Sequence, residues 1–104
     1  MELAEEVYVL IRFLPKEEQF SLSDQMRRAA VSVPSNIAEG HGRQTDRELK
    51  HFLSIAKGSV FELETQIHLC LRLGYFTQGQ AQKALSLVEE VSKILTSLIL
   101  KTKI

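Results

Sequence analysis

The feature that most constrains this fold is an apolar seam between residues 49 and 70. Its members alternate spacings of four and three residues: Leu49, Leu53, Ala56, Val60, Leu63, Ile67 and Cys70. This alternation forms one narrow stripe along a helix and is typical of helices that pack against other helices. The seam therefore predicts a long helix inside a bundle.

Local signals mark the ends of this helix. Thr45 and Glu48 have the pattern of a capping box, in which each side chain satisfies a free backbone N–H at the helix start. Gly74 stands where a left-handed residue is favoured after the last turn. Thr77 and Gln80 repeat the capping pattern, which predicts a fourth helix directly afterwards.

The fourth helix is predicted to reach about Lys101 and carries an apolar face too wide for a single seam. The members of this face are Leu85, Leu87, Val88, Val91, Ile94, Leu95, Leu98 and Ile99. Exposed apolar patches of such breadth usually mark contacts between molecules. We interpret the face as a subunit interface that includes Leu87, Ile94 and Leu98; central burial in the bundle is the alternative.

Two helices precede the seam. An apolar stripe that Pro15 ends predicts a first helix from Glu2 to Leu14, and its members are Leu3, Val7, Leu10 and Leu14. In the second helix, apolar spacing continues from Leu22 to Ile37 straight through Pro34. A proline inside a helix removes one backbone hydrogen bond and crowds the preceding turn, so Pro34 is predicted to kink this helix.

The residues after Pro34 are predicted to serve the bend. Short polar side chains bond to carbonyls that a helix irregularity leaves free. Three neighbours are expected to satisfy polar groups there: Ser35, Asn36 and Glu39. Gly40 and Gly42 are expected to end the helix.

Composition limits the classes of protein that remain. At 104 residues the whole chain is expected to be one domain, because a single core suffices at this length. Cys70 is the single cysteine and no signal-peptide pattern follows Met1, so we expect a cytoplasmic protein. No apolar run suggests a membrane span. The net charge is zero, although residues 1–24 hold six acids against two bases.

Little in the sequence suggests an enzyme. A helical bundle can hold a di-iron centre when two Glu-x-x-His motifs and two further glutamates face inward. Glu48 and His51 supply one such motif, and the second is missing. No phosphate-binding glycine loop, serine–histidine–aspartate set or zinc spacing is present. We expect no catalytic residues, no metal and no cofactor.

The strongest candidate for a functional site is a basic cluster around the turn between the second and third helices: Arg27, Arg28, Arg43, Arg47 and Lys50. Paired through that turn, the two helices would present a basic rim suited to phosphate, reinforced by free N–H groups at the start of the third helix. The alternative is a solvated face of ion pairs, because Glu39, Asp46 and Glu48 lie among the bases and Glu39 has the spacing to pair with Arg43.

Two runs of sequence, QMRRAAVSVPSNIAEGHGR and ELKHFLSIAKGSVFELETQ, resemble the small bacterial four-helix bundle proteins encoded by intervening sequences of 23S ribosomal RNA genes. The resemblance implies an all-α, antiparallel up-down-up-down bundle that assembles into a ring, typically a homopentamer, and associates with RNA. A related branch serves as the accessory protein of diversity-generating retroelements. Relatives usually have further residues before the point that matches Met1, so the first helix is expected to be truncated.

Two functions are compatible with these observations. In the first, the ring binds RNA or DNA, since a weak basic rim repeated around a ring meets a long polyanion several times. In the second, the ring is a scaffold or accessory subunit for a polymerase or ribosomal protein. Its docking face would be acidic and formed by Glu2, Glu5, Glu6, Glu17 and Glu18, unless these only solvate the surface.

Overall fold

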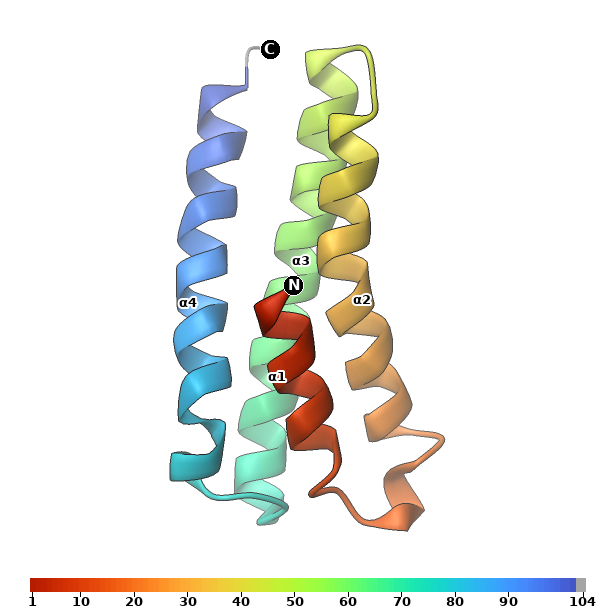
Figure 1. Cartoon of the computed structure of the whole chain (residues 1–104), viewed down its shortest axis with the longest axis vertical. Helices are drawn as coiled ribbons and strands as arrows, with labels where there is room; N and C mark the ends of the chain where they lie inside the picture. Colours follow the sequence, from red (N-terminus) through yellow and green to blue (C-terminus); the bar gives the residue numbers. More distant parts are fainter. Residues whose placement is uncertain (103–104) are drawn as a thin grey trace.

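The computed structural model describes residues 1–102 and consists of four α-helices (Figure 1). They are α1 (Glu2–Ile11), α2 (Leu22–His41), α3 (Asp46–Leu73) and α4 (Gln78–Lys101), and a short 3₁₀ helix, η1 (Lys16–Glu18), joins α1 to α2. The described residues contain no strand. Successive helices run in opposite directions, and each packs against its neighbours in the order α1, α2, α3, α4 and back to α1. The predicted all-α four-helix bundle is confirmed.

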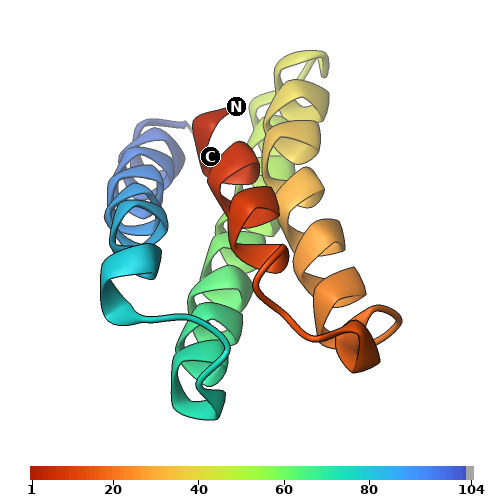
Figure 2. The same ribbon diagram turned by 60° about the horizontal axis from the view of Figure 1, so that its bottom comes forward.

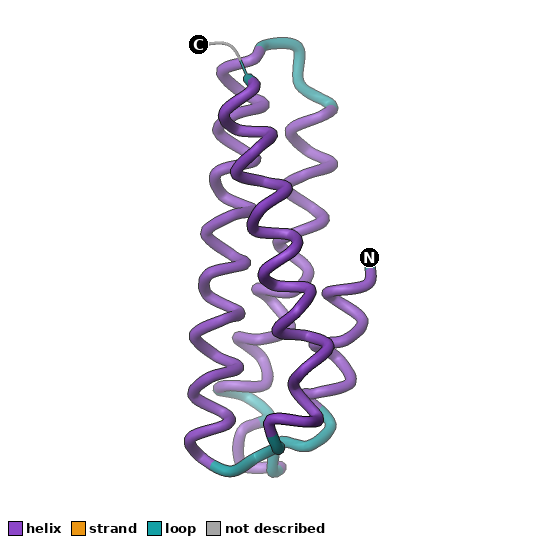
Figure 3. The backbone as a smooth tube through the Cα atoms, turned by 90° about the vertical axis from the view of Figure 1, so that its left-hand side faces the viewer, coloured by secondary structure: helices purple, strands orange, loops and turns teal. Residues whose placement is uncertain are grey.

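α1 is much shorter than the other helices and reaches only part of the way along the bundle (Figures 1 and 3). It lies between α2 and α4, across the bundle from α3 (Figure 2). It ends at Ile11 rather than at the predicted Leu14, because the chain tightens into 3₁₀-type turns. The N–H groups of Phe13 and Leu14 donate to carbonyls only three residues earlier.

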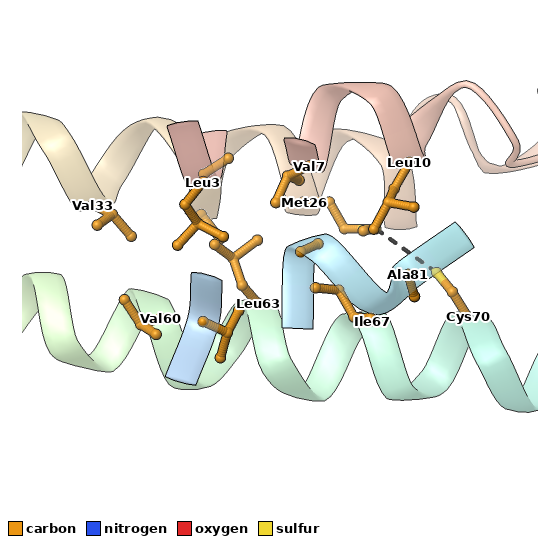
Figure 4. Close-up of a cluster of buried hydrophobic side chains, with 14 of the residues drawn as sticks. Leu3, Val7, Leu10, Met26, Val33, Val60, Leu63, Ile67, Cys70 and Ala81 are labelled. Carbon is orange, nitrogen blue, oxygen red and sulfur yellow. Dashed lines mark hydrogen bonds between the residues drawn. The ribbon is translucent and has the colours of Figure 1, made fainter. Parts of the chain in front are cut away.

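The core follows the predicted seam of α3. Six of its seven members are buried, and Leu49 packs at the margin of the core. Buried side chains from α1, α2 and α4 face this seam (Figure 4). Cys70 lies with its Sγ 3.8 Å from the Sδ of Met26. Burial raises the pKa of the Cys70 thiol to about 11, so it stays protonated at neutral pH and packs as an apolar group.

The helix caps agree closely with the predictions. Thr77 and Gln80 form a complete capping box at the start of α4. At the start of α3, the Thr45 hydroxyl accepts a hydrogen bond from the N–H of Glu48 at 3.2 Å. The Glu48 carboxylate accepts a hydrogen bond from the same hydroxyl and not from the backbone N–H of Thr45, as a complete capping box requires. This capping box is therefore half formed. Gly74 ends α3 in the left-handed conformation, with φ of 76°.

α2 continues without interruption through Pro34, as its apolar spacing predicts. Asn36 Nδ2 donates to the carbonyl and the hydroxyl of Ser32, at 2.8 and 2.9 Å, and Ser59 of α3 donates to the same hydroxyl at 2.8 Å. Asn36 therefore belongs to a polar network between α2 and α3. The kink at Pro34 stays a prediction.

Ser35 and Glu39 do not take part in this network, contrary to prediction. Ser35 is exposed and makes no side-chain hydrogen bond to another residue of the described chain. Glu39 is exposed and pairs with Arg43 instead. Both lie on the solvent side of α2, where they cannot reach the polar groups that face α3.

Gly40 has a different role from the one predicted, because it lies inside α2 and does not end it. A Cβ atom at this position would lie 3.1 Å from Phe52 Cβ and 3.3 Å from the Leu49 carbonyl oxygen. The absence of a side chain thus permits α2 to approach the start of α3 closely. α2 ends one residue later at His41, and Gly42 follows in a right-handed conformation.

Two contacts fasten the shorter elements to the bundle. The Tyr75 hydroxyl donates to the Glu18 carboxylate at 2.6 Å and links η1 to the α3–α4 connection. This bond and a second from Ser21 lower the pKa of Glu18, and the same carboxylate raises the pKa of Tyr75. Lys83 of α4 lies within 3.6 Å of carboxylates of both Glu2 and Glu6 in α1, and Glu6 is the main cause of its raised pKa.

Asn36→Ala removes both bonds to Ser32 and should lower the free energy of unfolding by about 1 kcal/mol, because the Ser32 oxygens lose a donor in a partly buried site. Ser35→Ala is the matched control and should change it by less than about 0.5 kcal/mol. Denaturant unfolding measures both variants. Equal stabilities for the two would show that the network does not stabilise the α2–α3 contact.

Gly40→Ala should lower the free energy of unfolding by about 1–3 kcal/mol, since the added methyl group forces α2 away from α3. Gly42→Ala is the control, because its Cβ would lie 3.5 Å from the nearest oxygen, an ordinary contact, and its backbone is right-handed. Thermal melts compare the two variants. A Gly40→Ala protein as stable as the Gly42→Ala protein would contradict the close approach.

Tyr75→Phe should raise the pKa of Glu18 toward its ordinary value, measurable by NMR titration of the carboxyl group. Because the pKa of Glu18 is lower in the folded chain than in the unfolded chain, the stabilisation is present above pH 4.5 and is lost as the pH falls through the folded value. The stability difference between wild type and Tyr75→Phe should therefore shrink on acidification. A difference that grows instead would contradict this sign.

Candidate nucleic-acid interface

The turn between α2 and α3 brings three of the five predicted basic residues to one end of the bundle. Arg43 lies in the turn, and Arg47 and Lys50 lie in the first turns of α3. Lys101, at the end of α4, lies at the same end (Figure 1). This set, Arg43, Arg47, Lys50 and Lys101, is called the basic end below.

The structure does not bring Arg27 and Arg28 into the basic end. They lie near the start of α2, and a helix rises 1.5 Å per residue, so roughly 22 Å of helix separates them from Arg43. Arg27 donates to the backbone carbonyl of Gln19 at 3.1 Å, and Arg28 pairs with Asp24 at 2.9 Å. Both guanidinium groups therefore have partners within the chain.

Arg43 is held in place by its neighbours. Its guanidinium group forms ion pairs with Glu39 and, at 3.8 Å, with Glu48, and it lies 4.9 Å from the centre of the Phe52 ring. The predicted pairing of Glu39 with Arg43 is confirmed. Two carboxylates offset the charge of Arg43, and its contacts link the turn to Glu39 of α2 and to Glu48 and Phe52 of α3.

Three members of the basic end, Arg47, Lys50 and Lys101, form no ion pair with another residue in the described part of the chain. Two of them, Arg47 and Lys50, belong to α3. They lie beside the start of α3, where the helix dipole favours anions and Thr45 engages only the N–H of Glu48. Asp46 in the first turn opposes this effect, so the two side chains contribute more to anion binding than the helix end does.

The predicted interface on α4 is mostly used inside the chain. Leu87 and Leu98 are partly buried and pack against the core, whereas Ile94 is 50% exposed. Val88 and Leu95 are fully buried. The broad face is therefore explained largely by packing within one bundle, and a subunit contact through it stays a prediction.

The acidic residues near the N-terminus are also partly engaged. Lys83 forms ion pairs with Glu2 and Glu6, and the Tyr75 hydroxyl donates to Glu18, whereas Glu5 and Glu17 have neither an ion pair nor a side-chain hydrogen bond to a described residue. Across residues 1–102, no three His, Cys, Asp or Glu side chains gather closely enough to hold a metal ion. None of the described helices has the length and apolar character needed to cross a membrane.

Sequence reasoning missed two features of this region. Lys101 joins the basic end only because α4 returns to the level of the α2–α3 turn, which no local pattern reveals. Ser32 and Ser59, which link the helices that support the turn, stand at positions with no distinctive motif.

These features define a small all-α bundle with a basic end. The chain belongs to the 23S rRNA-intervening sequence protein family, whose family model matches residues 1–97. It is similar to the crystal structure of a protein of unknown function from the S23 ribosomal protein family of Bacteroides thetaiotaomicron. That structure is 29% identical with a TM-score of 0.86, and the match covers 94% of this chain and 92% of the other. No curated protein matches the chain.

Proposed function

We propose that this protein is a non-enzymatic, ring-forming bundle that binds RNA through its basic end. The observation that carries the proposal is the pair of unneutralised cations, Arg47 and Lys50, beside the start of α3. Membership of a family named for the 23S ribosomal RNA intervening sequence supports ribosomal RNA as the ligand in preference to DNA. Phosphate contacts of this kind bind with little dependence on sequence.

Assembly supplies the affinity that one bundle lacks. The three free cations of one basic end neutralise few phosphates, so a single copy is expected to bind weakly. A ring, for which the resemblance implies five copies, presents the basic end repeatedly to one long polyanion, and linked binding events raise the overall affinity without new contacts. The alternative of a scaffold that docks through the acidic first helix has less support, because Lys83 already engages Glu2 and Glu6.

Wild-type protein should bind a labelled 23S ribosomal RNA fragment saturably at low salt and lose affinity steeply as salt rises. The double variant Arg47→Glu with Lys50→Glu should weaken binding by about tenfold or more and flatten the salt dependence, because phosphate contacts are lost. Lys16→Glu with Lys93→Glu changes the net charge equally at sites away from the basic end and should bind like wild type.

Fluorescence anisotropy with the fragment and with a random duplex of equal length measures these affinities. An equal loss in both double variants would assign binding to net charge alone. No binding of either ligand at low salt would remove the proposed function, whatever the assembly state.

A further inference from the structure

A groove between α2 and α3, on the outside of the bundle, has features that a single chain does not explain. Its volume is about 490 Å³, and its lining includes Leu22, Gly58, Phe61, Glu62, Gln66 and Leu69. Phe61 and Leu69 expose large apolar side chains there. This surface is called the α3 groove below.

The first unexplained feature is Gly58, in the middle of α3. Glycine destabilises a helix interior relative to alanine, so its presence needs a reason. Gly40 has one, because Phe52 and Leu49 leave no room for a Cβ atom. At Gly58 an added Cβ would meet no atom within 4 Å. Nothing in this bundle requires a glycine at that point, whereas a second molecule packed closely against it would.

The second unexplained feature is a set of polar groups without partners. Gln66 is 6% exposed, yet its Oε1 atom accepts no hydrogen bond from any described residue. A buried acceptor without a donor is unfavourable, and most native proteins avoid it. Glu62, at the edge of the groove, forms no ion pair within residues 1–102. In the α3 groove, Gln66 Oε1 therefore has no donor and Glu62 has no paired cation among the described residues.

A second surface of the same chain is also partly apolar but carries the complementary polar groups, a donor and a cation. Tyr8 and Val9 of α1 and Val31 of α2 are exposed and line shallow hollows between these helices. Arg12 borders one of them, and neither its guanidinium group nor the Tyr8 hydroxyl has a partner in the described chain. This α1–α2 face therefore offers apolar area, a free donor and a free cation, with the carboxylate of Glu5 at its margin.

We propose that the α1–α2 face of one copy packs into the α3 groove of a second copy. The occupant is the same chain because each surface supplies what the other lacks: donors and a cation on one, the Gln66 acceptor and Glu62 on the other. The two surfaces differ, so the contact is heterologous. They lie on adjacent sides of the bundle that share α2. Each copy is therefore rotated relative to the one before it, and the chain of contacts can close into a ring. This inference rests on the ring of the proposed function and names its surfaces.

Three single variants at exposed positions test the surfaces. Gly58→Gln fills the groove, Val31→Glu places a charge on the α1–α2 face, and Ile94→Glu is a matched control on α4. Light scattering should show a full oligomer for wild type and Ile94→Glu and a monomer for the other two, with the helical circular dichroism unchanged. A mixture of Gly58→Gln and Val31→Glu should form dimers, because it retains one intact face and one intact groove.

The alternative outcomes separate the surfaces from the function. If Gly58→Gln and Val31→Glu both keep the wild-type oligomer mass, the two proposed contact surfaces are contradicted but the proposed ring is not. A monomeric wild type overturns the ring and the surfaces together. Loss of assembly in Ile94→Glu alone moves the contact to α4, and a mixture that stays monomeric overturns the heterologous pairing. An intact oligomer that fails to bind the RNA fragment overturns the proposed function alone.

Discussion

The structure depends on the contact between α2 and α3. Three interactions are distributed along this contact. Gly40 packs against Phe52 near the turn, Ser59 bonds to Ser32 in the middle, and Cys70 lies beside Met26 toward the other end. Two long helices fixed at three levels cannot slide or rotate against each other. The turn that joins them is therefore held, and α1 and α4 pack against a pair whose geometry is already set.

The polar side chains at this contact form two sets, one with hydrogen-bond partners inside the described part of the chain and one without. Ser32, Ser59 and Asn36 satisfy one another inside the chain, so their burial favours one alignment of α2 with α3. Gln66 lies farther along the same boundary, and its Oε1 has no donor among the described residues. The first group accounts for stability of the bundle. The second lies in the α3 groove, where stability of a single bundle does not require it.

Features of the fold that depend on neighbouring residues could be predicted from the sequence. Features that depend on contacts or positions of residues far apart in the sequence could not. The α3 seam, the Thr77 cap and Gly74 follow from rules that act within a few residues. Gly40 looked like a helix end, because the approach of Phe52 is a long-range contact that no local pattern contains. The predicted basic rim included too many residues for a similar reason: Arg28 lies near the start of α2 and Arg43 in the turn after it, so the length of the helix separates them.

The position of the α3 groove on the bundle determines whether assembly leaves the basic end accessible. The groove and the α1–α2 face lie along the sides of the bundle, whereas Arg47 and Lys50 lie at one end. Cyclic symmetry places equivalent ends of all copies on the same side of a ring, so lateral contacts would gather the basic ends on one surface. A contact between the ends of bundles would instead bury Arg47 and Lys50. Lateral assembly is therefore the arrangement in which self-association strengthens the binding of a polyanion and does not compete with it.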